Sequence, residues 1–397
     1  MIFSATVTKR KPEVIDEDMT TASIVEYFSK VRDPRIERAR LHPLTSVLVL
    51  SLCAVVCGAN SFVAIEYFGK SREPWLRTFL DLPNGIPSHD TLGRIFAMLD
   101  PTALAGAFRE WTATLATLTK GEVVAIDGKT LRRSFREAGK SSFVHMVSAW
   151  ATGNQLVLGQ VKTDEKSNEI TAIPRLLALL QLQGCLVTID AMGCQKDIAQ
   201  KIVNSHADYL LAVKDNQPTL AQTIEGAFEE ALRDPGFATK HVKTTSRGHG
   251  RVEVRRCWTL RADAACGAPF DQWPKLKAIA LVEAERTVGE KTSVERRYYI
   301  TSRSKLSAKS ALAASRSHWG IENRLHWVLD VAFREDDCRV RAGNAAENFA
   351  VLRHIALNLL KSAKGGLKKN GTLGVHNKRL LAGWDDGYLL RVLGVNS

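Results

Sequence analysis

Apolar residues recur along the chain with two different spacings, and the change from one to the other falls near Gly121. Between residues 23 and 118 they repeat every three or four positions, which is the spacing of helices, with breaks at prolines and glycines. The most apolar run, residues 44–57, is too short to cross a bilayer and predicts a buried helix. We therefore expect a helical region over residues 21–118 and no membrane contact.

The chain after Gly121 alternates between strands and helices. The expected order is three strands, a helix, a strand, a helix and a strand, over residues 123–127, 143–150, 155–161, 171–182, 186–190, 195–205 and 209–213. Three antiparallel strands followed by a right-handed helical crossover to a parallel strand are typical of a ribonuclease-H-like mixed sheet. We predict an α/β fold in which the first strand is central and the strand after the crossover pairs beside it.

A second β-rich stretch follows before helical spacing returns. One helix and three strands predict a β-rich insertion at about residues 215–302, over residues 218–232, 251–260, 276–283 and 294–301. Helical spacing resumes near residue 305 and ends in an amphipathic helix over 344–361. We expect a flexible tail, a helical region, an α/β domain that contains the insertion, and a basic tail, over residues 1–20, 21–118, 119–364 and 365–397.

Charge narrows the choice of partner. The formal net charge is +13 and the pI is about 9.5, which favours a polyanion because lysine and arginine release counterions from phosphate. Basic clusters lie at residues 30–40, 240–256 and 351–380, and each alone is equally typical of a solvated face. Charge alone does not distinguish nucleic acid from an anionic membrane, but three clusters in one chain favour nucleic-acid binding over a solvated face. The short helices of residues 21–118 fit a helix-turn-helix-like DNA-binding unit or a plain packing domain.

Cysteine usage points to a reducing compartment. The seven cysteines are scattered through apolar segments and form no CxxC pair, which is typical of reduced thiols. Residues 1–11 lack the apolar core of a signal peptide. We expect a cytoplasmic protein.

Two of the predicted buried strands end in an aspartate, Asp127 and Asp190. The 63 residues between them match two hairpin strands and one crossover helix, so the predicted topology makes the two acids neighbours. Adjacent carboxylates repel unless a cation lies between them, and hard oxygen ligands favour Mg²⁺ or Mn²⁺. The alternative is that each is an ordinary strand-end aspartate that begins a turn.

A metal pair needs a further carboxylate, and a later helix offers Glu322. The apolar residues of this helix predict one face packed on the sheet, with Glu322 at its margin: Ile321, Leu325, Val328 and Ala332. His318 and His326 lie one turn to either side of Glu322. These three residues also have the helical spacing of zinc ligands, but the HExxH pattern is absent, and a polar helix rim explains them better.

At these acids the chain resembles the DDE transposases of bacterial insertion sequences, of the Rhs-linked H-repeat-associated type. The matching motifs are Ala125-Ile126-Asp127-Gly128-Lys129, Ile189-Asp190-Ala191, Lys214-Asp215-Asn216-Gln217, Gly248-His249-Gly250-Arg251 and His318-Trp319-Gly320-Ile321-Glu322-Asn323. Upstream, Asp33-Pro34-Arg35 and His42-Pro43-Leu44 resemble the helical domain that precedes the catalytic domain in this family. The resemblance covers about residues 20–365.

This resemblance implies a catalytic domain over residues 119–364 with Asp127, Asp190 and Glu322 as the triad that binds two Mg²⁺ or Mn²⁺ ions. The chain departs from the wider superfamily's Tyr-Arg-Glu-Lys signature, because it has Ser315, His318 and Leu329 at the other three positions. The third acid is therefore less certain than the two aspartates. Its rivals are Asp330, Asp336 and Asp337.

Phosphate contacts are expected from basic residues near the triad and in the insertion, namely Lys129, Arg251, Arg255, Arg256, His318, Arg324 and His326. A P-loop at Lys129-Thr130 is excluded because Val123 stands where that motif requires glycine. Trp319 and Trp327 are interpreted as packing residues, with stacking on an unpaired base as the alternative.

The function that the resemblance implies is DNA transposition, in which strands are cleaved at element ends and joined to target DNA. Two alternatives stay open: a nuclease without strand transfer, and a DNA-binding relative that has lost catalysis. We expect the partners to be element-end and target DNA and further copies of the chain, in a homodimer or larger oligomer. The expected location is the bacterial cytoplasm, on the nucleoid.

Overall fold

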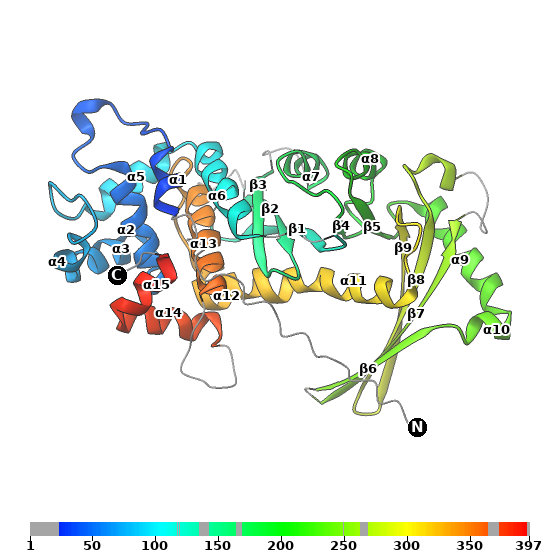
Figure 1. The fold of residues 1–397 in the computed structure, drawn as a ribbon. Coiled ribbons are helices and arrows are strands. Elements are labelled where there is room, and N and C mark those ends of the chain that lie inside the picture. The colour runs from blue at the N-terminus through cyan, green and yellow to red at the C-terminus, as the bar shows by residue number, and fades with distance from the viewer. Residues whose placement is uncertain are drawn as a thin grey trace, which may run out of the picture.

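A mixed sheet organises the computed structural model, which describes residues 24–116, 118, 120–134, 143–163, 169–248, 250–262, 269–363 and 373–394 (Figure 1). The strand order within the described residues is β3-β2-β1-β4-β5-β9-β8-β7-β6. The predicted α/β class with a mixed sheet is confirmed. The expected flexible tail over residues 1–20, like His249, lies outside the described residues.

The first five strands lie as the topology predicts, with β1 in the middle. They are β1 (Val123–Leu131), β2 (Val144–Ala151), β3 (Leu156–Lys162), β4 (Leu186–Ile189) and β5 (Asp208–Val213). β1 pairs antiparallel with β2 up to Leu131 but parallel with β4 only as far as Ile126, which lies beside Ile189. β4 is buried throughout because both faces of this part of the sheet are covered, and its residues are apolar except for Thr188.

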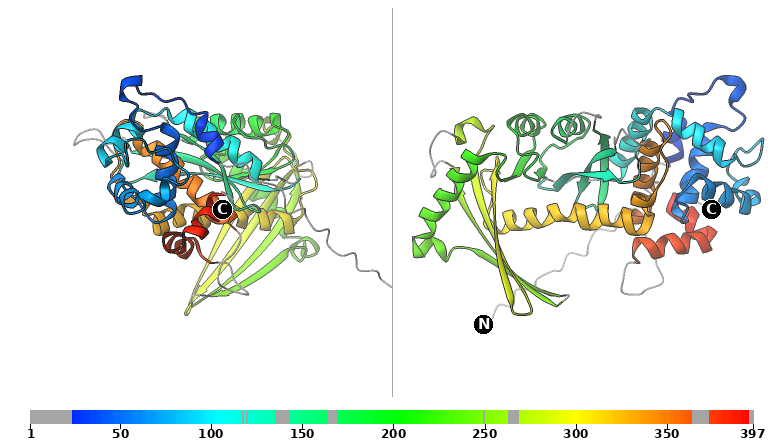
Figure 2. Two further views of the ribbon diagram at one scale, coloured as in Figure 1. Left: turned by 60° about the vertical axis from the view of Figure 1, so that its left-hand side comes forward. Right: turned by 180° about the vertical axis from the view of Figure 1, so that it is seen from behind.

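Helices cover the two faces of these strands. α7 (Glu169–Leu177) and α8 (Lys196–Asn204) lie on one face, and α11 (Ala308–Ile321) crosses the other (Figures 1 and 2). Every third or fourth residue of α8 is apolar and buried, as in Ile198 and Ile202, so one stripe of the helix packs on the sheet. The sheet edge that carries the acids is consequently enclosed between helices from both sides.

The amino-terminal helices share one core with helices from the end of the chain. They are α1 (Ile24–Ser29), α2 (Leu44–Val56), α3 (Phe62–Ser71), α4 (Glu73–Leu76), α5 (His89–Met98) and α6 (Pro101–Leu115). α13 (Ala345–Ser362) packs between them and the sheet (Figure 1). Its buried Asn358 accepts a hydrogen bond from the Val157 amide and donates one to the Val157 carbonyl, each at 2.9 Å, which covers the β3 edge.

α2 forms the centre of this core, as its apolar sequence predicts. The segment Glu37–Val56, which begins at the short helix η1 (Glu37–Ala39), is long and apolar enough to span a membrane by composition. Two-thirds of its most apolar window is buried against protein, which is typical of a core helix.

The predicted insertion extends the central sheet. After α9 (Pro218–Leu232) and α10 (Pro235–Ala238) come β6 (Val242–Gly248), β7 (Arg251–Arg261), β8 (Ala278–Val288) and β9 (Lys291–Thr301), with η3 (Phe270–Gln272) between β7 and β8. β9 pairs antiparallel with β5, so that Val213 lies beside Tyr298. The far halves of these strands project beyond the helices and carry mostly exposed side chains (Figure 2).

The carboxyl-terminal segment contains two packed helices where the sequence predicts a basic tail. They are α14 (Val375–Trp384) and α15 (Asp386–Leu393). Two of the basic residues are buried: Lys378 donates to the Leu360 carbonyl at 2.6 Å, and Arg379 donates to the Val55 carbonyl at 2.6 Å. These cations cap carbonyl groups at helix ends, so that part of the basic cluster serves packing.

Candidate active site

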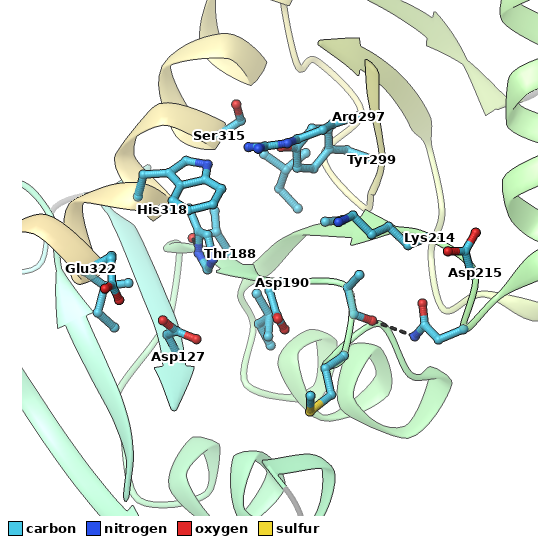
Figure 3. A pocket seen from close by; sticks show the side chains of 18 residues that line it. Asp127, Thr188, Asp190, Lys214, Asp215, Arg297, Tyr299, Ser315, His318 and Glu322 are labelled. Carbon is cyan, nitrogen blue, oxygen red and sulfur yellow. Dashed lines mark hydrogen bonds between the residues drawn. The ribbon is translucent and has the colours of Figure 1, made fainter. Parts of the chain in front are cut away.

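The two predicted aspartates lie where β1 and β4 separate. β1 continues past Ile126 paired with β2 alone, and β4 ends at Ile189, so Asp127 and Asp190 follow the last pair of residues that the two strands share. Both side chains line one pocket of about 700 Å³ (Figure 3). The amide of Gly193 donates to Asp190 Oδ1 at 3.3 Å and helps to orient that carboxylate. The predicted neighbourhood of the two acids is confirmed.

Glu322 reaches the same pocket from the helix that crosses the sheet. α11 ends at Ile321, a π-helical turn covers Glu322–His326, and α12 (Trp327–Phe333) continues the helix. A π-helical turn adds a residue to the turn and changes the direction of its side chains, and such turns are frequent at functional sites. Leu325 and Leu329 stay buried against the core, while 56% of the Glu322 side chain is exposed.

His326 completes a compact group of possible metal ligands. One ligand atom from each of Asp127, Glu322 and His326 lies within 4.8 Å of the others. His326 Nδ1 donates to Glu322 Oε2 at 3.1 Å and lies 3.6 Å from Asp127 Oδ2. Asp190 lies outside this group of three, although it lines the same pocket.

The electrostatics of the site favour a bound cation. Burial raises the pKa of Asp127 to about 7, and the charges of Glu169, Asp190 and Glu322 act in the same direction. Burial likewise raises the pKa of Asp190. Among the described residues, no lysine or arginine forms an ion pair with Asp127, Asp190 or Glu322. Negative charge therefore gathers here without an ion-paired lysine or arginine among the described residues.

Comparison with known proteins decides the family. Residues 118–359 match the family model "Transposase DDE domain", and residues 25–112 match the model "DDE_Tnp_1-associated". The chain is 43% identical to "Putative transposase YncI" of Escherichia coli O157:H7 over 88% of this chain and 91% of that protein. The chain belongs to the DDE transposase family. It is also 39% identical to "H repeat-associated putative transposase YhhI" of Escherichia coli strain K12, over 94% and 98% of the two chains.

The resemblance to H-repeat-associated transposases is thus confirmed, and the family makes this transposase an enzyme of the nuclease and transposase kind whose partner is DNA. The associated-domain match coincides with helices α1 to α6. The DDE-domain match spans the sheet, the insertion and α13.

The rivals for the third acid of the transposase are held by ion pairs elsewhere. Lys129 Nζ lies 2.6 Å from Asp330 and 3.2 Å from Asp336. Asp336 also pairs with Arg132 at 3.1 Å, and Asp337 pairs with Arg334 at 3.1 Å. These acids already have cations, which favours Glu322 as the third acid.

Lys129 therefore differs from its expected role as a phosphate contact. Only 11% of its side chain is exposed, and its ammonium group is engaged by the two aspartates. The ion pairs join β1 to α12 and to η5 (Glu335–Asp337). Lys129 fixes the position of the helix that carries Glu322.

Neither histidine predicted to contact DNA is exposed: His326 is buried, and His318 is half-buried in the wall of the pocket that the three acids line. His318 Nδ1 lies 3.2 Å from the Thr188 hydroxyl, and burial lowers the pKa of His318 to about 4, so that it is neutral at pH 7. His326 is 4% exposed, and burial lowers its pKa as well. Neither offers a cation to phosphate at neutral pH.

The arginines predicted to contact DNA differ in whether they form ion pairs within the protein. Arg251 and Arg324 are exposed, and no described residue forms an ion pair with either. Arg255 pairs with Glu253 at 2.6 Å, and Arg256 pairs with Glu285 at 3.0 Å across neighbouring strands. Glu285 comes from β8, outside the cluster at residues 240–256, so this cluster is less basic in the fold than its own sequence indicates.

Several residues of the pocket wall have no role in the sequence-based prediction. Lys214 follows β5 at the same sheet edge that holds Asp127 and Asp190, and its side chain is exposed. The Arg297 guanidinium lies 4.7 Å from the centre of the Trp319 ring. The sequence could have predicted that Lys214 lies at this pocket, because Lys214 directly follows a parallel strand and the carboxyl ends of parallel strands meet at one edge of the sheet.

Glu169 is the other residue that the sequence-based prediction omits. It begins α7, and its Oε1 accepts a hydrogen bond from His145 Nε2 at 2.8 Å. Its charge is the one that most raises the pKa of Asp127 after burial itself. No local pattern marks it, because it lies at the start of a helix 42 residues after Asp127.

Proposed function

We propose that this transposase cleaves DNA strands at the ends of a mobile element and joins the freed ends to target DNA, in a ribonuclease-H-like catalytic domain. Asp127, Asp190 and Glu322 would hold two Mg²⁺ or Mn²⁺ ions. The observation that carries the proposal is the meeting of three uncompensated carboxylates, from β1, from the end of β4 and from the helix across the sheet, at one pocket.

The donor set fits a hard divalent cation. The three acids supply carboxylate oxygens, which Mg²⁺ and Mn²⁺ prefer, and the raised pKa of Asp127 indicates that a positive charge beside it would be strongly stabilising. His326 hydrogen-bonds Glu322, so we assign it the role of orienting that carboxylate. When bound, a pair of such ions activates the attacking oxygen and stabilises the leaving oxygen of a phosphodiester.

The chain's own residues would then position the DNA. Lys214 lies at the pocket beside Asp190, lowers the pKa of that acid and forms no ion pair with any described residue, so it is suited to a phosphate. Arg324 is exposed two residues from Glu322, and Arg251 is exposed at the tip of the β6–β7 hairpin. These three cations outline a path for the DNA backbone from the pocket to the insertion.

The proposal is tested with a duplex that carries an element end. We expect Asp127→Asn and Asp190→Asn each to abolish Mg²⁺-dependent cleavage while the affinity for the duplex stays within about threefold, because the change leaves the exposed cations in place. Cleavage rates and DNA affinity are measured on the same preparations. Unchanged cleavage in both variants would refute the site.

The same assay separates the alternatives. Cleavage without joined products favours a nuclease, and DNA binding without cleavage by the wild-type chain favours a degenerate relative. We further propose that a homodimer or larger oligomer assembles on the DNA in the cytoplasm, because two element ends must be held together. If light scattering finds only one copy of the chain in a complex that holds two element ends, this proposal is wrong.

A further inference from the structure

A buried carboxylate approaches the active site from the face of the sheet opposite α11. Glu169 begins α7, and 12% of its side chain is exposed. Since an ionised carboxylate only accepts, His145 Nε2 donates the 2.8 Å hydrogen bond to Glu169 Oε1. The other ring nitrogen of His145 then accepts from the Thr130 hydroxyl at 2.8 Å. This pair of hydrogen bonds fixes both the ring and the carboxylate.

Gly128 makes room for this arrangement directly beside Asp127. A Cβ atom at Gly128 would lie 2.1 Å from Glu169 Oε1 and 2.4 Å from His145 Nε2, closer than real Cβ atoms come. Neighbouring residues of a strand point to opposite faces of the sheet. Gly128 therefore faces the α7 side, where Glu169 lies, and Asp127 faces the other side. Because Gly128 has no side chain, the Glu169 carboxylate can lie close to the point where β1 and β4 separate.

Glu169 belongs electrostatically to the active site. Its charge raises the pKa of Asp127 more than the charge of Asp190 or Glu322 does, and it raises the pKa of Asp190 as well. Among the described residues, His145 donates a hydrogen bond to this carboxylate, and no lysine or arginine forms an ion pair with it. Its Oε2 atom has no hydrogen-bond partner there.

One cation does not account for all of these acids. The ligand atoms of Asp127, Glu322 and His326 lie within 4.8 Å of one another, a span that suits a single ion, and neither Asp190 nor Glu169 is part of that group. A pair of metal ions about 3.5–4 Å apart would need more donors than this group supplies. Four carboxylates would also balance the charge of two divalent ions.

We propose that Glu169 is a fourth metal-binding carboxylate of this transposase, which serves the second cation together with Asp127 and Asp190, and that His145 is the positioning residue for Glu169. This inference rests on the metal site of the proposed function.

Binding of Mn²⁺ alone to the full chain, measured by calorimetry and by electron paramagnetic resonance, tests the proposal without an activity assay. We expect two Mn²⁺ per wild-type chain, and in Glu169→Gln one ion lost or weakened at least about tenfold. Glu347→Gln is the matched control, since Glu347 is another carboxylate whose pKa burial raises but which lies in α13. It should bind two ions as the wild type does.

Gly128→Ala is the second variant, because it keeps all four carboxylates and displaces the Glu169 carboxylate. It should lose the same ion, and Mn²⁺ should raise its melting temperature less than that of the wild type. Two ions bound with wild-type affinity in either folded variant overturn the proposal. If the wild type binds no Mn²⁺, or Asp127→Asn binds it unchanged, the metal site of the proposed function fails instead. Melting in chelator verifies that each variant is folded.

Discussion

Two acid-rich clusters lie side by side between β1 and the α11–α12 helix, and they differ in one respect. The open cluster contains Asp127, Glu322 and His326, and the paired cluster contains Lys129, Asp330 and Asp336. Asp127 and Lys129 are two residues apart on the same face of β1. The paired cluster has an ammonium group among its carboxylates, whereas in the open cluster the one described ion-pair partner is a histidine whose pKa burial lowers.

This difference separates the acids of the proposed metal site from acids that are paired within the protein. In the paired cluster the negative charges are balanced inside the protein, and below it Arg353 and Glu335 form a buried ion pair at 3.5 Å. In the open cluster no described lysine or arginine forms an ion pair with Asp127 or Glu322, so the balancing charge would come from outside the protein. Carboxylates on one helix can therefore have different roles. The role depends on whether a lysine of the neighbouring strand, here Lys129, forms an ion pair with the carboxylate.

The difference between the two clusters is tested most directly by neutralising one acid in each. We expect Glu322→Gln to lower the rate of metal-dependent cleavage on the order of 10²–10³-fold, the loss typical when one charge-stabilising group leaves a catalytic site. Asp330→Asn on the same helix should keep cleavage within about tenfold and lower the free energy of unfolding by about 1 kcal/mol, because Asp330 is partly exposed. Cleavage rates and urea unfolding measure both. Equal loss of cleavage in the two variants would contradict the distinction.

Removing the cation of the paired cluster should affect stability. Lys129→Met leaves Asp330 and Asp336 without their shared partner, and we expect the free energy of unfolding to fall by about 3 kcal/mol, as when one partner of a largely buried pair is removed. The salt dependence of DNA binding should not change. Lys214→Met is the matched control, with unchanged stability and a slope of DNA affinity against salt that falls by about one. The reverse pattern would assign the phosphate contact to Lys129.

The open cluster should also respond to pH in the metal-free protein. Asp127 has a pKa raised from 3.8 to about 7 by burial and by the facing acids Glu169, Asp190 and Glu322. A raised carboxyl pKa means that the folded chain holds a proton which the unfolded chain releases, so this stability is present below about pH 4 and is lost as pH rises through 7.

The measurement is the melting temperature in chelator between pH 5 and pH 8. The difference between Asp127→Asn and the wild type should grow in favour of the variant by a few degrees as pH rises, which corresponds to about 3 kcal/mol. Parallel curves for the two proteins would show that Asp127 ionises freely. Glu347→Gln again serves as the control for a buried carboxylate outside the cluster.

The positions of the strands and the two aspartates followed from local patterns. Buried strands such as β4 are short apolar runs with an acid at the end, and the order of strands and crossover helices restricts the sheet to few topologies. The insertion was recognised as β-rich for the same reason. Its joining to β5 through β9 was missed, because pairing between distant strands leaves no mark in either strand's own spacing.

The roles of the basic residues were predicted least well. Lys129, Lys378 and Arg379 are all basic in sequence and buried in the fold, where aspartates or carbonyl groups from distant elements satisfy them. A charge count treats each cation as free to meet DNA. Only the packing shows which of them are already occupied.

Local patterns in the sequence predict the class of fold, the family and the two aspartates that follow apolar runs, because apolar spacing and short motifs depend on residues that are near each other in the chain. The expected strand end at Asp127 is wrong, since β1 runs on to Leu131 beside β2. The tertiary structure alone decided which acids stand without a cation. It placed Glu169 behind Gly128 and Lys129 between Asp330 and Asp336. The charge state of a buried group depends on neighbours in space, and these come from segments tens to hundreds of residues apart in the chain.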